Sequence, residues 1–147
     1  VRLRPAEFDF DTHLDNFSKL SALLPPFDKG LASLIDRLKE RGLFRSTAIM
    51  VAGEFGRTPK INSQGGRDHW ARAMFALMAG GDIEGGQVIG ETDDRAGAPV
   101  GKGYSPDDLA ASFFQNIGIN SKHEFQTNIG RPINLVRDGK PIAQLFS

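Results

Sequence analysis

The sequence predicts an α/β fold with a mostly parallel sheet and a C-terminal hairpin. Segments 47–53 (TAIMVAG) and 73–79 (AMFALMA) are apolar runs that end at glycine, which is typical of strands buried on both faces of a parallel sheet. A helical apolar pattern precedes the first run, and a helix feeding a buried strand is half of a βαβ unit. The Asp-Gly pair within 137–140 lies between two apolar runs and indicates a hairpin turn.

The N-terminal third is expected to hold the end of a strand and two helices. Residues 1–10 are short and mixed and fit a strand end, and 14–24 repeat leucine and phenylalanine at helical spacing. Pro25 and Pro26 should interrupt this helix, because proline has no N–H to donate. Gly42 should end the second helix. That helix is predicted by one apolar stripe: Phe27, Leu31, Leu34, Ile35 and Leu38.

The remaining elements follow from composition and capping signals. Ser105 and Pro106 are a capping residue and a first-turn proline, and they predict a helix from there to about Ile117. The other expected elements are a loop over 54–70, a short strand over 87–91, a loop over 92–104, and hairpin strands over 133–136 and 141–146.

Composition excludes several classes of protein. The 147 residues carry 18 basic and 18 acidic side chains, so no basic surplus indicates a nucleic-acid partner. The absence of cysteine excludes disulfides and thiolate metal sites, and it leaves the compartment open. No apolar run approaches the roughly 20 residues of a membrane span. The chain begins at Val1 without methionine, and we expect this start to lie in the middle of a longer protein.

Three polar clusters lie where ligands of α/β sheets usually bind, next to the ends of the predicted strands. They are 11–13 (Asp-Thr-His), 54–59 (Glu-Phe-Gly-Arg-Thr-Pro) and 65–70 (Gly-Gly-Arg-Asp-His-Trp). Carboxylate and imidazole groups in one pocket suit Zn²⁺ or a harder ion such as Mn²⁺ or Mg²⁺. Such an ion polarises a phosphoryl or sulfuryl oxygen, and nearby arginines hold the anion.

Each cluster also has a structural interpretation. Asp11 and His13 would equally serve as the N-cap and first turn of a helix. Glu54 and Arg57 would form a structural salt bridge, and His69 would pack on the neighbouring tryptophan. Asp68 would support a metal ligand or cap a loop, while His123 is interpreted as a solvated surface residue. The pairs Gly80-Gly81 and Gly85-Gly86 match no phosphate-binding motif and are interpreted as turns.

Taken in order, these strings resemble the domain of unknown function 1501 family, which groups with the alkaline phosphatase and sulfatase superfamily. The resemblance covers 11–15 and 47–92 and, more loosely, the Ser-Pro-Asp-Asp-Leu-Ala string at 105–110. It implies that the whole chain, 1–147, is the C-terminal portion of one alkaline-phosphatase-like domain, a three-layer αβα sandwich. The half of the protein that carries the superfamily's nucleophile is then absent.

The resemblance also implies a set of metal ligands. Asp11 and His13 would share a metal, Glu54 would be the acidic ligand at a strand end, and His69 would be a further histidine ligand. Asp9 stands four residues before His13 and competes with Asp11 for its role.

Further site residues follow from the same resemblance. Phe55 stands where the superfamily usually has a histidine ligand. The number of bound ions, one or two, is therefore left open, as is their identity among Zn, Mn, Mg and Ca. Arg57 and Arg67 would hold the substrate anion, and Asp68 would join the metal site by orienting His69.

The function implied is that of the metal-site portion of a hydrolase acting on a small-molecule or glycan phosphate or sulfate ester. Two alternatives stay open. One is a non-catalytic binding or assembly module that retains the fold, and the other is a phosphomutase-type transferase. The expected partners of the chain are the ester substrate and the absent N-terminal half of the same protein. The resemblance implies a periplasmic or exported location.

Overall fold

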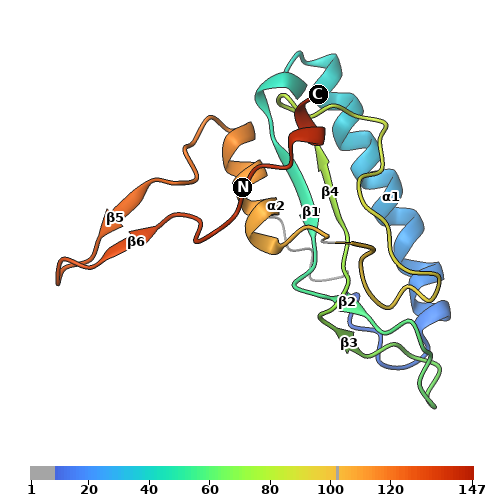
Figure 1. Ribbon diagram of the computed structural model, residues 1–147. Helices are drawn as coiled ribbons and strands as arrows, with labels where there is room; N and C mark the ends of the chain where they lie inside the picture. Colours follow the sequence, from blue (N-terminus) through green and yellow to red (C-terminus); the bar gives the residue numbers. More distant parts are fainter. Residues whose placement is uncertain (1–8, 102) are drawn as a thin grey trace. The chain divides into compact units, whose positions relative to one another are not determined.

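Figure 1 shows a computed structural model of the chain, which describes residues 9–101 and 103–147. The strand end expected within 1–10 falls almost entirely outside the described residues. The chain divides into two compact units. The first unit contains 9–42, 53–75 and 92–98, and the second contains 43–52, 76–91 and the described part of 99–147.

Helix α1 (Asn16–Glu40) is the main element of the first unit. The predicted interruption is wrong, because Pro25 and Pro26 both lie inside this continuous helix. Both prolines are exposed, and the half-buried positions on either side of them form one stripe with helical spacing. Burial along a single uninterrupted stripe therefore outweighs the hydrogen bonds that the two prolines cannot donate. The stripe comprises Leu20, Leu23, Phe27, Leu31, Ile35 and Leu38.

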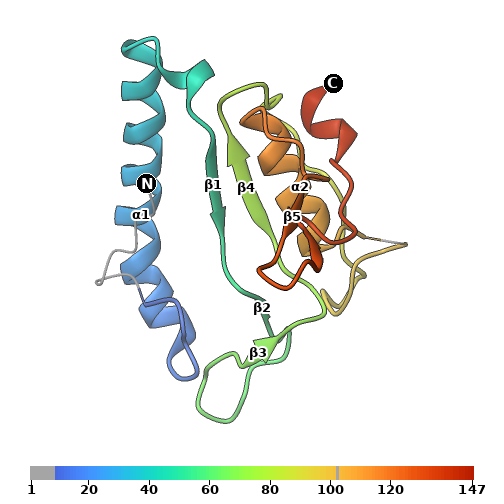
Figure 2. The same cartoon turned by 90° about the vertical axis from the view of Figure 1, so that its left-hand side faces the viewer.

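Two short strands complete the first unit. Strand β2 (Gly56–Arg57) pairs antiparallel with β3 (His69–Trp70), with Gly56 opposite Trp70. The close packing at β2 requires glycine, because a Cβ atom at Gly56 would lie 1.8 Å from the carbonyl oxygen of Ala73. The predicted loop over 54–70 is thus a narrow antiparallel ribbon with a long connection (Figure 2).

The sheet of the second unit corrects the predicted fold class. Strands β1 (Ile49–Ala52) and β4 (Ala76–Ala79) coincide with the two apolar runs, but they pair antiparallel, with Ile49 opposite Ala79. Burial alternates along β1, and Met50 is 43% exposed, so this strand is not buried on both faces. In the described residues we find three two-stranded antiparallel sheets and no part of a parallel three-layer sandwich.

The connection between β1 and β4 explains this error. A parallel pair needs a crossover, usually a helix, whereas an antiparallel pair needs only a reversal of the chain. Residues 53–75 contain β2 and β3 and no helix, so the chain returns as a ribbon. Apolar composition alone predicts a strand, but it does not predict the direction of its partner.

Helix α2 (Pro106–Asn116) centres the second unit and begins where the sequence predicts. The Ser105 side chain accepts a hydrogen bond from the Asp108 N–H, and the Asp108 carboxylate accepts one from the Ser105 N–H, which forms a capping box. The buried apolar side chains are Ala111 on this helix and, from the C-terminal segment, Val136 and Ile142.

The C-terminal hairpin exists, but it lies upstream of its predicted position. Strands β5 (Glu124–Gln126) and β6 (Pro132–Asn134) form it and extend away from α2 in Figure 1. Residues 137–140 instead pass the start of α2, where the Lys140 N–H donates to Asp108 Oδ1. Residues 143–146 form a 3₁₀ helix, η2 (Ala143–Phe146), rather than a strand.

Two further segments differ from the predicted elements. Residues 87–91 form no strand, and a short 3₁₀ helix, η1 (Phe44–Ser46), precedes β1. Within residues 9–101 and 103–147, no helix has the length and apolar character needed to cross a bilayer.

Candidate metal centre

The polar clusters 11–13 and 65–70 meet in the first unit, where the chain enters α1. Leu14 forms an isolated antiparallel bridge with Gly65, and the Arg67 N–H donates to the Thr12 carbonyl at 3.0 Å. A further bond of 3.0 Å joins the Asn16 N–H to the Gly65 carbonyl. Main-chain hydrogen bonds therefore hold together two segments that lie about fifty residues apart in the sequence.

Gly66 is required for this approach. It is buried, and a Cβ atom at this position would lie 1.9 Å from the carbonyl oxygen of His13. No side chain fits there without moving one of the two segments. The glycine pair before Arg67 thus allows the backbones of the two segments to lie in contact. This contact places the side chains of 11–13 next to those of 67–69.

Three ligand atoms converge at this junction. Asp11 Oδ1 lies 3.0 Å from His69 Nε2 and 3.2 Å from His13 Nε2, and the two imidazole nitrogens lie 3.1 Å apart. In the part of the chain that the structure describes, this is the one group of three or more histidine or acidic side chains with the spacing of a metal site.

Asp68 supports the group from the other side of one imidazole. Its Oδ1 atom lies 2.8 Å from His13 Nδ1, so the carboxylate accepts a hydrogen bond from the protonated Nδ1. In a neutral imidazole with its proton on Nδ1, the Nε2 atom carries no proton, and here Nε2 is directed at Asp11 and His69. A carboxylate bound to the second nitrogen of a ligating histidine is the usual support of a metal-binding imidazole.

Arg57 supplies the positive charge of the site. Its Nη2 atom donates to Asp11 Oδ1, and its Nη1 atom donates to the Arg67 carbonyl at 3.2 Å. The hydrogen bond from Arg57, followed by that from His69, lowers the pKa of the Asp11 carboxyl group to about 2. Asp11 is therefore a carboxylate, ready to bind a cation, at any physiological pH.

The pKa of Asp68 is lowered as well. The largest cause is its hydrogen bond with His13, and the second is the hydrogen bond from Asn62. The side chains of Asp11, His13, Asp68 and His69 are between 41% and 53% exposed, so a ligand can reach them from solvent.

In a comparison with protein-family models, the model described as protein of unknown function (DUF1501) matches residues 1–146. The chain belongs to the domain of unknown function 1501 family. Comparison with curated proteins and with solved structures gave no match. Family membership, predicted from the strings at 53–59 and 65–70, is thereby confirmed.

Within this member of the domain of unknown function 1501 family, the structure brings together three of the predicted metal ligands. Asp9 is not part of this three-residue group. Its Oδ1 atom instead accepts a hydrogen bond of 2.9 Å from the Asp11 N–H. Glu54 is exposed and is not part of the three-residue group. Helix α1 has Asp15 as its N-cap residue, so Asp11 and His13 do not cap it.

The two predicted anion-binding arginines have different surroundings. Arg67 donates two hydrogen bonds of 2.6 Å to the Thr58 and Pro59 carbonyls, and it lies over the Phe17 ring. Its guanidinium group thus ties the loop after β2 to the segment before β3. Arg57, in contrast, contacts one of the converging ligands directly.

Three features of the site were not predicted from the sequence. Asp68 contacts His13 rather than the neighbouring His69. The Phe55 ring packs at 4.3 Å from the His69 ring, which restricts the orientation of that imidazole. Asn62 was not predicted, although asparagine in a loop is known to hydrogen-bond the backbone two residues further on, as Asn62 does with the Gln64 N–H.

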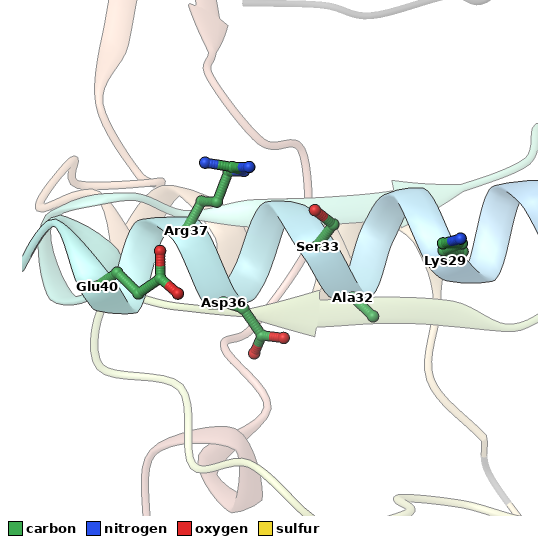
Figure 3. Close-up of a pocket in the computed structure, with 6 residues that line it drawn as sticks. All are labelled: Lys29, Ala32, Ser33, Asp36, Arg37 and Glu40. Atoms are coloured by element: carbon green, nitrogen blue, oxygen red, sulfur yellow. The ribbon is translucent and has the colours of Figure 1, made fainter.

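A shallow hollow elsewhere in the first unit contains none of these residues. Figure 3 shows its lining on successive turns of α1: Lys29, Ala32, Ser33, Asp36, Arg37 and Glu40. All six are exposed, and charges of both signs alternate along the helix, which is typical of a solvated helix face. The hollow is thus separate from the converging side chains of Asp11, His13 and His69.

Proposed function

We propose that Asp11, His13 and His69 bind one divalent metal ion, and that Zn²⁺ suits the three ligands best. The observation that carries this proposal is the triangle formed by one carboxylate oxygen and two imidazole nitrogens, with sides between 3.0 and 3.2 Å.

The size of the triangle supports a small ion. Ligand atoms about 2.1 Å from a metal lie roughly 3.0 Å apart in an octahedral site and roughly 3.4 Å apart in a tetrahedral one. The observed sides fall between these two values. Two imidazoles favour Zn²⁺ over Mg²⁺ or Ca²⁺, which prefer oxygen ligands throughout. Three protein ligands with an open outer side are also the pattern of catalytic rather than structural zinc.

The chemistry we propose for this centre is hydrolysis of a phosphate or sulfate ester. A divalent ion at the three ligands would polarise a phosphoryl or sulfuryl oxygen of the substrate. Arg57 would hold another oxygen of the same group, because its guanidinium lies against the ligand Asp11 and is only 24% exposed. Affiliation with the alkaline phosphatase and sulfatase superfamily belongs to this proposal, which rests on the donor set and not on the sheet.

A non-catalytic metal-binding module is the second candidate. It is favoured by two contacts, one that occupies a predicted anion-binding arginine and one that packs against a predicted metal ligand. Arg67 donates hydrogen bonds to the Thr58 and Pro59 carbonyls, and the Phe55 ring packs against the His69 ring. In this alternative the centre would bind an ion and an anionic group without cleaving an ester.

The first experiment measures binding of Zn²⁺ by isothermal titration calorimetry to metal-free protein. We expect one ion per chain, and we expect its binding to be lost in His69→Ala, which removes one of three ligands. His123→Ala is the matched control, since His123 is exposed and its ring packs on Phe125 in the second unit. Unchanged zinc binding in His69→Ala would exclude this ligand set.

A second experiment separates the two candidates. The full-length protein, loaded with Zn²⁺ or Mn²⁺, is incubated with chromogenic phosphate and sulfate esters. Turnover that disappears in Arg57→Gln but not in Arg45→Gln supports the hydrolase, because Arg45 lies in the second unit and pairs with Asp82. Stoichiometric metal without turnover of either ester supports the binding module.

A further inference from the structure

Asn62 lies in the connection between β2 and β3, and its side chain makes four hydrogen bonds. Its Nδ2 group donates to Asp68 Oδ1 at 3.1 Å and to the His13 carbonyl at 3.0 Å. Its Oδ1 atom accepts from the backbone N–H groups of Gln64 and Gly66, both at 2.9 Å. These four bonds use both N–H donors of the amide and both acceptor positions of its oxygen.

The orientation of the amide is fixed by these partners. Backbone N–H groups only donate, so the side of the amide that faces Gln64 and Gly66 must be its oxygen. A flipped amide would direct its NH₂ group at two donors and its oxygen at the Asp68 carboxylate. The NH₂ group of Asn62 is therefore locked toward the metal centre.

This arrangement links both halves of the supporting pair. Asp68 Oδ1 accepts from Asn62 and, at 2.8 Å, is bonded to His13 Nδ1. The same NH₂ group holds the main chain of His13 through its carbonyl. One amide thus fixes the carboxylate relative to the backbone of the residue whose ring that carboxylate orients. The placement of the His13 ring then depends on Asn62 as well as on Asp68.

We propose that Asn62 is a positioning residue of the metal centre. It holds Asp68 against Nδ1 of His13, which keeps the proton on that nitrogen and leaves Nε2 to bind the ion. This inference rests on the metal binding proposed above. Supporting groups of this kind typically change metal affinity by about 10- to 100-fold when they are removed.

A purely structural role in the loop makes a different prediction. The bonds that Asn62 accepts from Gln64 and Gly66 shape the loop, whereas the bonds that it donates act on the centre. Asn62→Asp separates the two roles, because it keeps both acceptor positions and removes both donors. It also places a second carboxylate beside Asp68, which repels that side chain from its position against His13.

The test compares wild type with Asn62→Asp, using Asn120→Asp as the matched control. Asn120 also accepts a backbone hydrogen bond, from the Lys122 N–H at 3.0 Å, but it lies in the second unit. Both variants add the same charge, and charge alone would strengthen the attraction for a cation. We expect Zn²⁺ affinity to fall about 10- to 100-fold in Asn62→Asp and to stay unchanged in Asn120→Asp.

A spectroscopic measurement on the metal-free protein completes the test. Long-range ¹H–¹⁵N correlation spectra report which nitrogen of a neutral imidazole carries the proton. In the wild type we expect the proton of His13 on Nδ1, and in Asn62→Asp we expect a large shift toward Nε2, which free imidazole side chains prefer. A loop role alone would leave this tautomer unchanged.

The outcomes distinguish this inference from the proposed function. If the wild type binds no Zn²⁺, the proposed function fails, and the tautomer still decides whether Asn62 positions the pair. A wild-type proton on Nε2, or an Asn62→Asp variant with unchanged affinity and tautomer, would overturn the inference. If Asn62→Asp does not fold, Asn62→Ser replaces it, because its short hydroxyl can accept from the loop but cannot reach Asp68.

Discussion

Replacing Arg57 by glutamine should raise the pKa of the Asp11 carboxyl group. In the wild type this pKa is lowered from its ordinary value of 3.8 to about 2, and the hydrogen bond from Arg57 is the largest cause. The second cause, the hydrogen bond from His69, persists in the variant. The pKa should therefore return only part of the way toward 3.8.

The size of the change follows from these values. The full depression is close to two pH units, which corresponds to a loss of proton affinity of roughly 60-fold. Because Arg57 provides the largest share of several, we expect Arg57→Gln to restore about one unit, or roughly tenfold in proton affinity. The exchange of guanidinium for a neutral amide keeps a hydrogen-bond donor at the site while removing its charge.

The sign of the stability effect follows from the direction of the shift. A carboxyl group with a lower pKa in the folded state stabilises the fold above its unfolded value, and this stabilisation is lost as the pH falls through its folded value. For Asp11 this window runs from about pH 4 down to about pH 2. In Arg57→Gln the folded value lies closer to the unfolded one, so less stability is lost within the window.

The measurement is a pH titration of the Asp11 carboxyl carbon by ¹³C NMR on metal-free protein. Arg45→Gln serves as the control, since Arg45 pairs with Asp82 in the second unit, outside the centre. An Asp11 pKa that stays near 2 in Arg57→Gln would refute the assignment of the shift to this ion pair.

Three further predictions concern the junction, the helix cap and the supporting carboxylate. Gly66→Ala places a Cβ atom 1.9 Å from the His13 carbonyl oxygen and should lower the free energy of unfolding by roughly 2–4 kcal/mol; urea denaturation that shows wild-type stability would contradict this. Ser105→Ala removes the acceptor for the Asp108 N–H and should cost about 1 kcal/mol by the same assay, whereas no change would mean that the capping box does not stabilise α2. Asp68→Asn should weaken Zn²⁺ binding about 10- to 100-fold by calorimetry, and equal affinity would show that the carboxylate charge is unimportant.

The local features of the fold were predictable from the sequence, and the non-local ones were not. Helix α2 begins at the predicted cap because Ser105 and Asp108 act within one helical turn. The two apolar runs do contain strands β1 and β4. Their antiparallel pairing depends on how residues 53–75 return the chain, and an apolar run carries no information about direction.

Helix α1 shows the opposite kind of error, in which a strong local signal was overruled. Pro25 and Pro26 predict a break, yet the stripe of half-buried side chains keeps one helical register from Leu20 to Leu38. Such a break would separate two halves that are already in phase. The register of the stripe was visible in the sequence, and it was the better predictor of the two.

For the candidate site, the sequence identified three of the residues that meet, but it also included Glu54, which is not part of that group, and did not show how the others support one another. The motifs that contain Asp11, His13 and His69 predicted a shared site, and these three side chains do converge. The partner of Asp68 and the contribution of Asn62 depend on side-chain directions across the junction. Those directions arise from the main-chain bonds between the two segments, which no spacing rule describes.

The hydrogen bonds of the centre that join its two segments have a consequence for the order of folding. His13 and Asp68 are 55 residues apart, His13 and His69 are 56, and Asp11 and His69 are 58. Closing a flexible loop of that length costs roughly 3–4 kcal/mol of chain entropy in the unfolded state, so early encounters between these side chains are rare. We therefore expect the centre to assemble late in folding, after α1 and the β2–β3 ribbon have shortened the effective distance. A peptide of either segment alone carries only part of the ligand set.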